Sequence, residues 1–439
     1  MIEHMLAAAL RHPDVAQADV LFRETDQLDL KFEAGRLKES SRAQESGVNL
    51  RVVARGRVGV AGTTDVASAG WEQDLLARAL ASAEQGEAYE LAFPARRAVP
   101  EALTYDPMAA DLPVAALAAI GRALVEGLAR PGWQVNAGAS RAVETTRVIN
   151  AAGQDVAYRA TSISVGADLT RVVGDDVLMA YDQLALVGAP DAAALERLAR
   201  GIVTRIERAE RVVPPPAGGR MPVLFTPNGS EALFLPLRQA LSGKTVLQGV
   251  SPLGGRLGEA VFDAALTMTD EPLLAGRVGT RPADDEGVPS ARLPLVEGGV
   301  VRAFVYDLET AARAGAVSTG HGRRSVFGKP HIAFSNLVIA AGLAAEADLL
   351  RAVGSGLVVD ELIGVGQGNV VSGAFSHPVA LAYRVENGEI TGRVKDAAVA
   401  GNAYDLLKRI RAVGKDAQWL GGTRHVPPLV LDGVSVAGR

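Results

Sequence analysis

Residues 134–172 read QVNAGASRAVETTRVINAAGQDVAYRATSISVGADLTRV, two long β-like stretches joined by the short turn Asn150-Ala151-Ala152-Gly153. A similar pattern occurs nearer the N-terminus, where Leu28, Leu30 and Phe32 alternate with polar residues and so share one face of a strand. Gly35 supplies the turn into the next strand. Long strands joined by short turns predict antiparallel sheets in this half of the chain.

Helices are predicted on either side of these strands. A short helix is expected at residues 3–10, and another begins near Trp71, where apolar residues recur at roughly helical spacing. Asp111 is expected to cap a third helix and Asp191 a fourth, because an aspartate before an apolar helical pattern satisfies free backbone N–H groups. This order predicts a layered α+β arrangement.

Two proline-rich segments, at 93–107 and 213–219, predict boundaries between three blocks. We therefore expect domains at 1–92, 108–212 and 220–439. The last block consists of short apolar runs broken by many glycines, which is typical of a barrel-like or sandwich-like β domain. The predicted class is α+β, with an N-terminal antiparallel sheet and flanking helices, a middle α/β-type segment and a Gly-rich, mainly antiparallel C-terminal domain.

Composition excludes several classes of protein. The 439 residues are 48% hydrophobic and 22% charged, which supports large folded cores. The net charge of -5 argues against nucleic acid or a membrane as a partner. The absence of cysteine excludes disulfides, thiolate zinc sites and a cysteine nucleophile. With no signal-peptide pattern at the start, a cytoplasmic protein is expected.

Local catalytic motifs are missing from the sequence. No G-x-S-x-G element marks a serine nucleophile. The six histidines include no two at the three-to-five-residue spacing of a local metal pair. Catalysis by this chain alone would therefore need residues that are far apart in the sequence, for instance His321, His377 and Asp285.

Eight polar residues are candidates for lining a peptide channel or an interface. Three form the acidic cluster 284–286, which has a base or a cation site as one interpretation and a solvated turn as the other. Three come from the loop 318–324, where a structural turn is the alternative, and two from the glycine-rich segment 364–369, which is otherwise a turn between strands. The candidates are Asp284, Asp285, Glu286, His321, Arg323, Arg324, Gln367 and Asn369.

The window Ser230-Glu231-Ala232-Leu233-Phe234-Leu235 is the most informative for function. A zinc hydrolase needs two or three imidazoles or carboxylates around the ion, with an acid or base beside it. Here only Glu231 has that chemistry, because a serine hydroxyl is a poor ligand and leucine has none. We predict no metal ligand and no catalytic residue in this window.

Short motifs spread along nearly the whole chain resemble, in their order, the TldD/TldE family, also called PmbA or DNA gyrase modulators. They are GVNLRVV at 47–53, GRVG at 56–59, GRLGE at 255–259, DDEGVP at 284–289, STG at 318–320, GAFS at 373–376, ENGEI at 386–390 and VSVAG at 434–438. The zinc-bearing TldD-like branch carries H-E-x-x-x-H and a later cysteine. In this chain Ser230 and Leu235 stand in the histidine places, so the resemblance is to the TldE/PmbA-like branch.

The resemblance implies a non-catalytic subunit of an intracellular zinc metalloprotease complex that acts on unfolded peptides or peptide precursors. Zinc is then expected only in a TldD-like partner, and this chain is expected to be inactive alone. It would form a heterodimer with that partner or a homodimer. Two alternatives remain open: an autonomous hydrolase with a non-standard site, and a regulatory binding protein linked to DNA gyrase.

Overall fold

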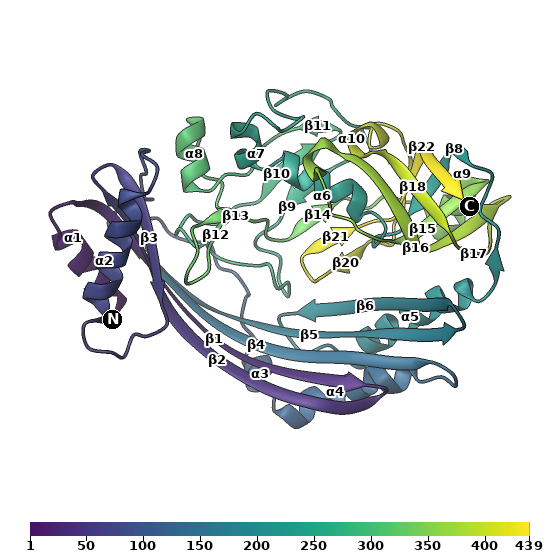
Figure 1. Cartoon of the computed structure of the whole chain (residues 1–439), viewed down its shortest axis with the longest axis horizontal. Helices are drawn as coiled ribbons and strands as arrows, with labels where there is room; N and C mark the ends of the chain where they lie inside the picture. The colour runs from purple at the N-terminus through teal and green to yellow at the C-terminus, as the bar shows by residue number, and fades with distance from the viewer. Residues whose placement is uncertain (439) are drawn as a thin grey trace.

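A computed structural model describes residues 1–438 of the chain. Its first half is built on one antiparallel sheet of six strands in the order β3-β2-β1-β4-β5-β6 (Figure 1). The strands are β1 (Val15–Glu33), β2 (Arg36–Ala54), β3 (Arg57–Thr63), β4 (Gln134–Asn150), β5 (Asp155–Val173) and β6 (Asp176–Leu186). The predicted long antiparallel strands and the turns at Gly35 and 150–153 are confirmed. Strand β6 was not predicted.

Helices cover one face of this sheet. They are α1 (Ile2–Arg11), α2 (Trp71–Glu84), α3 (Pro107–Ala110), α4 (Val114–Leu128) and α5 (Ala192–Ala209). Leu28, Leu30 and Phe32 point to this face, as predicted, and pack in one core with α4 and α5. Gly121 of α4 permits the close approach, because a Cβ there would lie 2.4 Å from the Phe32 ring.

The two predicted helix caps had different outcomes. Asp191 caps α5 as expected, since its carboxylate accepts a hydrogen bond of 2.7 Å from the Ala194 backbone N–H. The prediction that Asp111 caps the helix that follows it, α4, is wrong. Asp111 ends the extra short helix α3, whose cap is Asp106, and α4 begins after Pro113 without a side-chain cap.

The C-terminal half contains a closed barrel and a second sheet. The barrel strands, in order, are β15 (Gly356–Leu362), β8 (Gly219–Phe225), β22 (Leu429–Gly438), β18 (Ala397–Asn402) and β16 (Ala374–Glu386), and β15 pairs with β16 to close the ring. β17 (Glu389–Val394), β7 (Val212–Val213) and β19 (Ile410–Val413) extend it. The predicted barrel-like domain and the α+β class are confirmed.

The second sheet lies beside the barrel and shares its core. Its order is β11 (Val300–Val301), β10 (Leu293–Glu297), β9 (Met268–Asp270), β14 (Leu337–Ile339), β21 (Arg424–Val426) and β20 (Gln418–Leu420). The short strands β12 (Gly322–Arg323) and β13 (His331–Ile332) form a separate pair. The helices are α6 (Glu231–Ala240), α7 (Gly243–Leu247), α8 (Leu308–Ala314), α9 (Glu346–Val353), α10 (Ala403–Leu406) and the 3-10 helix η1 (Val370–Ser372).

The first two predicted blocks contribute three strands each to the same six-stranded sheet. The domain limits 1–92, 108–212 and 220–439 therefore stay a prediction about folding units. In the part of the chain that the structure describes, no helix is both long enough and apolar enough to cross a membrane.

Candidate functional site

Helix α6, whose start contains the window 230–235, follows barrel strand β8 in the sequence after a short loop. Ser230 is buried at the start of the helix, and its hydroxyl donates a hydrogen bond of 2.6 Å to the Pro227 carbonyl. Gly229 lies so close to β15 that a Cβ there would be 2.2 Å from the Val359 carbonyl oxygen. The start of α6 is thus held firmly against the barrel, and the Ser230 hydroxyl is committed to the backbone.

The Glu231 carboxylate lies between two arginines. Arg238, two turns along the same helix, donates from Nη2 at 2.5 Å, and Arg424 of β21 donates from Nη1 to the other oxygen at 2.6 Å. All three side chains are partly exposed. Both carboxylate oxygens therefore accept hydrogen bonds from guanidinium groups, whose positive charges oppose the approach of a metal ion.

The last position of the window, Leu235, stands in the second histidine place and offers only methyl groups. It is half-buried beside Gly366, whose ideal Cβ would lie 3.5 Å from Leu235 Cδ2. Zinc takes nitrogen, sulfur or oxygen ligands. Residues 230–235 and their neighbours therefore do not fit a zinc ion, and residues 1–438 contain no cluster of three His, Cys, Asp or Glu side chains suited to a metal.

The acidic cluster 284–286 is buried, so its interpretation as a solvated turn is wrong. Asp285 accepts from Arg23 Nη2 at 2.9 Å and from the Arg324 backbone N–H at 2.9 Å. Asp284 accepts from three backbone N–H groups, including that of Gly322 at 2.9 Å. The cluster joins the loops of the C-terminal half to the sheet face opposite the helices, a contact between segments far apart in the sequence.

Glu286 belongs to the same network, and its pKa is shifted upward. Its carboxylate accepts from Arg51 Nη1 at 2.5 Å and from the Leu308 backbone N–H at 2.7 Å. Burial, aided by the nearby Asp284 charge, outweighs Arg51 and raises the pKa of Glu286 to about 7. Arg51 and Arg324 both also bind Asp19 of β1, with shortest contacts of 2.8 and 2.9 Å. These groups make a closed ion network inside the chain.

The remaining loop residues have distinct surroundings. The buried His321 ring contacts Asp270 at 3.1 Å through Nε2 and Thr319 Oγ1 at 2.9 Å through Nδ1. Arg323 reaches Asp285 at 3.3 Å. His377 lies on β16, where its ring stacks on Phe375. The His321 ring is bonded to Asp270 and not to Asp285, so the structure does not assemble the three-residue site of the autonomous hydrolase.

Gln367 and Asn369 lie apart from that network, on the exposed loop between β15 and η1. This loop is next to α6, since η1 packs on the helix and Gly366 faces Leu235. The structure thus divides the eight candidates into five buried residues, the partly exposed Arg323 beside them, and an exposed pair beside α6. Their role in a peptide channel or an interface stays a prediction.

Sequence reasoning overlooked a cavity close to the start of α6. Residues 226–228 line it together with Asp182 of β6 and a row of arginines on α5, at 197, 200, 205 and 208. Their spacing on one side of a helix was a usable signal, because the apolar residues of α5 occupy the other side. Asp182 gave no signal, since strand β6 itself was not predicted.

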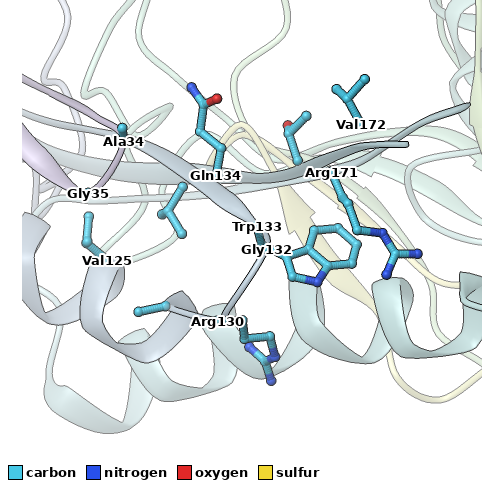
Figure 2. Close-up of a pocket in the computed structure, with 12 residues that line it drawn as sticks. Ala34, Gly35, Val125, Arg130, Gly132, Trp133, Gln134, Arg171 and Val172 are labelled. Carbon is cyan, nitrogen blue, oxygen red and sulfur yellow. The ribbon is translucent and has the colours of Figure 1, made fainter. Parts of the chain in front are cut away.

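A second hollow, drawn in Figure 2, lies where the turn between β1 and β2, the start of β4 and the end of β5 meet the end of α4. It has a volume of about 470 Å3, and its walls come only from the first half of the chain. The Trp133 ring forms one wall, with the Arg171 guanidinium carbon 4.6 Å from its centroid. No side chain in this hollow belongs to the candidates above.

Two family models match the sequence. The model described as PmbA/TldA metallopeptidase domain 1 matches residues 18–85, and the one described as the C-terminal domain matches residues 218–438. A metalloprotease of Methanothermobacter thermautotrophicus is 31% identical over 224 residues, which are 51% of this chain and 48% of that protein. PmbA of Escherichia coli O157:H7 is 32% identical over 200 residues, 45% of this chain and 42% of that protein. The matched region thus spans about half the length of these curated relatives.

Solved structures resemble the chain over its full length. TldE from Thermococcus kodakarensis superposes with a TM-score of 0.88 and 23% identity, covering 99% of both chains, which shows a common fold. A Thermotoga maritima protein described as a candidate modulator of a DNA gyrase has a TM-score of 0.86 and 25% identity, again over 99% of both chains.

Proposed function

The chain belongs to the TldD/TldE (PmbA) family of metallopeptidase-like proteins, and from this premise we propose that it is a metal-free subunit of a two-subunit metalloprotease. In this proposal a TldD-like partner carries the zinc ion and cleaves the peptide, while the present chain completes the enclosure around the substrate. A cytoplasmic location is part of the proposal.

One observation carries the proposal: Glu231 is bound by Arg238 and Arg424. A general base in a zinc peptidase must have a free oxygen to take a proton from metal-bound water. Here the two guanidinium groups donate to both carboxylate oxygens and occupy the space beside them. Ser230 and Leu235 supply no ligand that would draw a zinc ion to this place.

The proposed partnership has support among the relatives. Haemophilus influenzae has both a TldD homolog, 30% identical over 198 residues, and a PmbA homolog, 29% identical over 221 residues. Two related but distinct proteins in one organism are what a heterodimer of the two branches requires. A homodimer of this chain is the alternative when the partner is absent.

The proposed substrates are unfolded peptides or peptide precursors. An extended peptide can add to an exposed strand edge through backbone hydrogen bonds, which read no side chain. Strand β6 is an edge strand of the large sheet, and Val177 and Met179 on it are exposed. Such an edge would favour unfolded chains with little preference for sequence.

The test is to purify the chain alone, a TldD-like partner alone and the two together, and to measure zinc content and cleavage of an unfolded peptide. We expect about one zinc per heterodimer and cleavage only when the partner is present. Glu231→Gln in this chain should leave cleavage intact, whereas the same change in the partner's H-E-x-x-x-H should abolish it. Stoichiometric zinc and efficient cleavage by the single chain would overturn the proposal.

A further inference from the structure

The cavity at the start of α6 has a volume of about 390 Å3 and lies between α5 and the outer wall of the C-terminal barrel. The apolar part of its wall includes Leu224 of β8 and Val358 of β15. The polar part comes from α5 and from Asp182. Glu231 does not line it, so this cavity is separate from the pair of arginines described above.

The arginines of α5 differ in how they are paired. Arg205 binds Asp360 at 2.5 Å and also contacts Glu361, and Arg208 binds Glu346 at 2.6 Å. Arg197 and Arg200 are exposed at the mouth of the cavity. Neither has an acidic side chain within 4.0 Å anywhere in residues 1–438. The mouth therefore carries two free positive charges.

Asp182 is a partly buried carboxylate of the cavity wall that has no basic side chain within 4.0 Å in residues 1–438. It sits on the face of β6 that points toward α5, and within residues 1–438 its only hydrogen-bond donor is the adjacent Gln183 N–H at 2.7 Å. Burial raises the pKa of Asp182, because that hydrogen bond and the more distant Arg205 do not replace the lost water. The ionised form lacks a partner here.

The inner end of the cavity has an excess of negative charge. Arg205 faces Asp360 and Glu361, so this group already carries one net negative charge before Asp182 is added. Since Asp360 and Glu361 are bonded to Arg205, Asp182 is the free carboxylate next to α5. Asp416, the other lining carboxylate without a basic side chain within 4.0 Å in residues 1–438, is exposed. One carboxylate is too few ligands for a divalent cation but is enough for one ammonium group.

Gly201 keeps the space above this carboxylate open. It lies in the middle of α5, where glycine is unfavourable compared with alanine. No neighbour forces glycine at this position, because the nearest heavy atom to an added Cβ is Asp182 Oδ2 at 4.0 Å. A side chain here would project into the cavity over the Asp182 carboxylate.

We propose that the cavity binds a primary ammonium group, from the amino terminus or a lysine side chain of an extended peptide, with Asp182 as its counter-ion. Arg197 and Arg200 at the mouth then face the carbonyl or carboxylate oxygens of the same peptide. The peptide as the source of the ammonium group rests on the proposed function, but the charge and shape of the cavity do not. Residues 226–228 of its wall lead directly into α6.

The test uses the full chain alone and isothermal titration calorimetry at pH 7.5 with three alanine-based tetrapeptide amides. One has a free amino terminus, one is N-acetylated, and one is N-acetylated and contains a single lysine. The free amino terminus, the lysine or both should bind, and the blocked lysine-free peptide should not. Equal binding of all three, or no binding at millimolar concentration, would overturn the inference.

Two variants locate the binding. Asp182→Asn should weaken binding at least tenfold and raise the melting temperature, because asparagine keeps the hydrogen bond without the cost of a buried charge. Gly201→Leu should also abolish binding while the chain stays folded. Asp175→Asn, the same charge change on the exposed β5–β6 turn, is the matched control and should alter neither property. Unchanged affinity in Asp182→Asn would contradict the assignment.

These measurements need neither the partner nor cleavage, so they separate the two proposals. A chain that binds no ammonium group can still be the metal-free subunit. Conversely, ammonium binding can persist in a chain that does not support cleavage by a TldD-like partner.

Discussion

Arg424 Nη1 and a Glu231 carboxylate oxygen are 2.6 Å apart, although 193 residues separate the two in the sequence. The ion pair joins the first turn of α6 to the short strand β21. Its side chains are 31% and 28% exposed, so water weakens the attraction. The pair thus links α6 to the second sheet and adds modestly to the free energy of unfolding.

A double-mutant cycle on Glu231→Gln and Arg424→Gln should measure that gain. We expect a coupling free energy of about 1 kcal/mol in urea unfolding, because the pair is partly exposed but its geometry is favourable. The exposed pair Glu297 and Arg302, joined at 3.1 Å, is the control and should show less coupling. A coupling indistinguishable from zero at Glu231 would mean that the pair does not hold α6 in solution.

The window at α6 was predictable from the sequence only in part. Residues 230–235 lack metal ligands, and this alone predicts a site without zinc chemistry. The ion pair between Glu231 and Arg424 was not predictable, because Arg424 belongs to a strand of three residues with no periodic signal. The ion pairs of Glu231 with two arginines become apparent only in the three-dimensional structure.

The same limit applies to the rest of the fold. The long strands β1 and β5 and the helix α5 follow from their periodic apolar residues, which pack on one shared core. The acidic cluster at 284–286 looked like a turn because its cationic partners Arg23 and Arg51 lie more than 230 residues away. Local patterns predict elements well, whereas buried ion networks depend on which elements meet.

Glu286 should make stability depend on pH. Its pKa is raised from 4.5 to about 7 in the folded chain, so its contribution to stability is complete below pH 4.5 and is lost as pH rises through 7. The loss is on the order of 3 kcal/mol for a shift of this size. Urea unfolding between pH 5 and 8 should therefore show a declining contribution from this residue.

The variant Glu286→Gln isolates that contribution, because it cannot ionise. Its free energy of unfolding should vary less with pH than that of the wild type, because glutamine stays neutral throughout and keeps an acceptor oxygen for Arg51. Glu297→Gln, at an exposed position, should keep the wild-type pH profile. An identical profile in Glu286→Gln would show that other groups set the pH dependence.

The contact between the N-terminal sheet and the loop after Arg324 should be sensitive to a single methyl group. A Cβ at Gly62 would lie 1.9 Å from the Val326 carbonyl oxygen. Gly62→Ala should therefore lower the free energy of unfolding by about 2 kcal/mol or more, the range for overpacked sites. Gly138→Ala is the matched control on β4, where the nearest atom is 3.9 Å away, and it should be nearly neutral. Equal effects of the two changes would mean that the loop does not rest on the sheet.

The two aspartates that the sequence offered as helix caps give a direct comparison. Asp191→Ala removes the acceptor for the Ala194 N–H at the start of α5 and should cost about 1 kcal/mol in urea unfolding. Asp111→Ala should cost much less, because the Asp111 side chain caps neither α3 nor α4. Asp191→Asn serves as the conservative control and should retain most of the stability, since asparagine is an equally good cap. A larger loss in Asp111→Ala than in Asp191→Ala would contradict the arrangement of these helix starts.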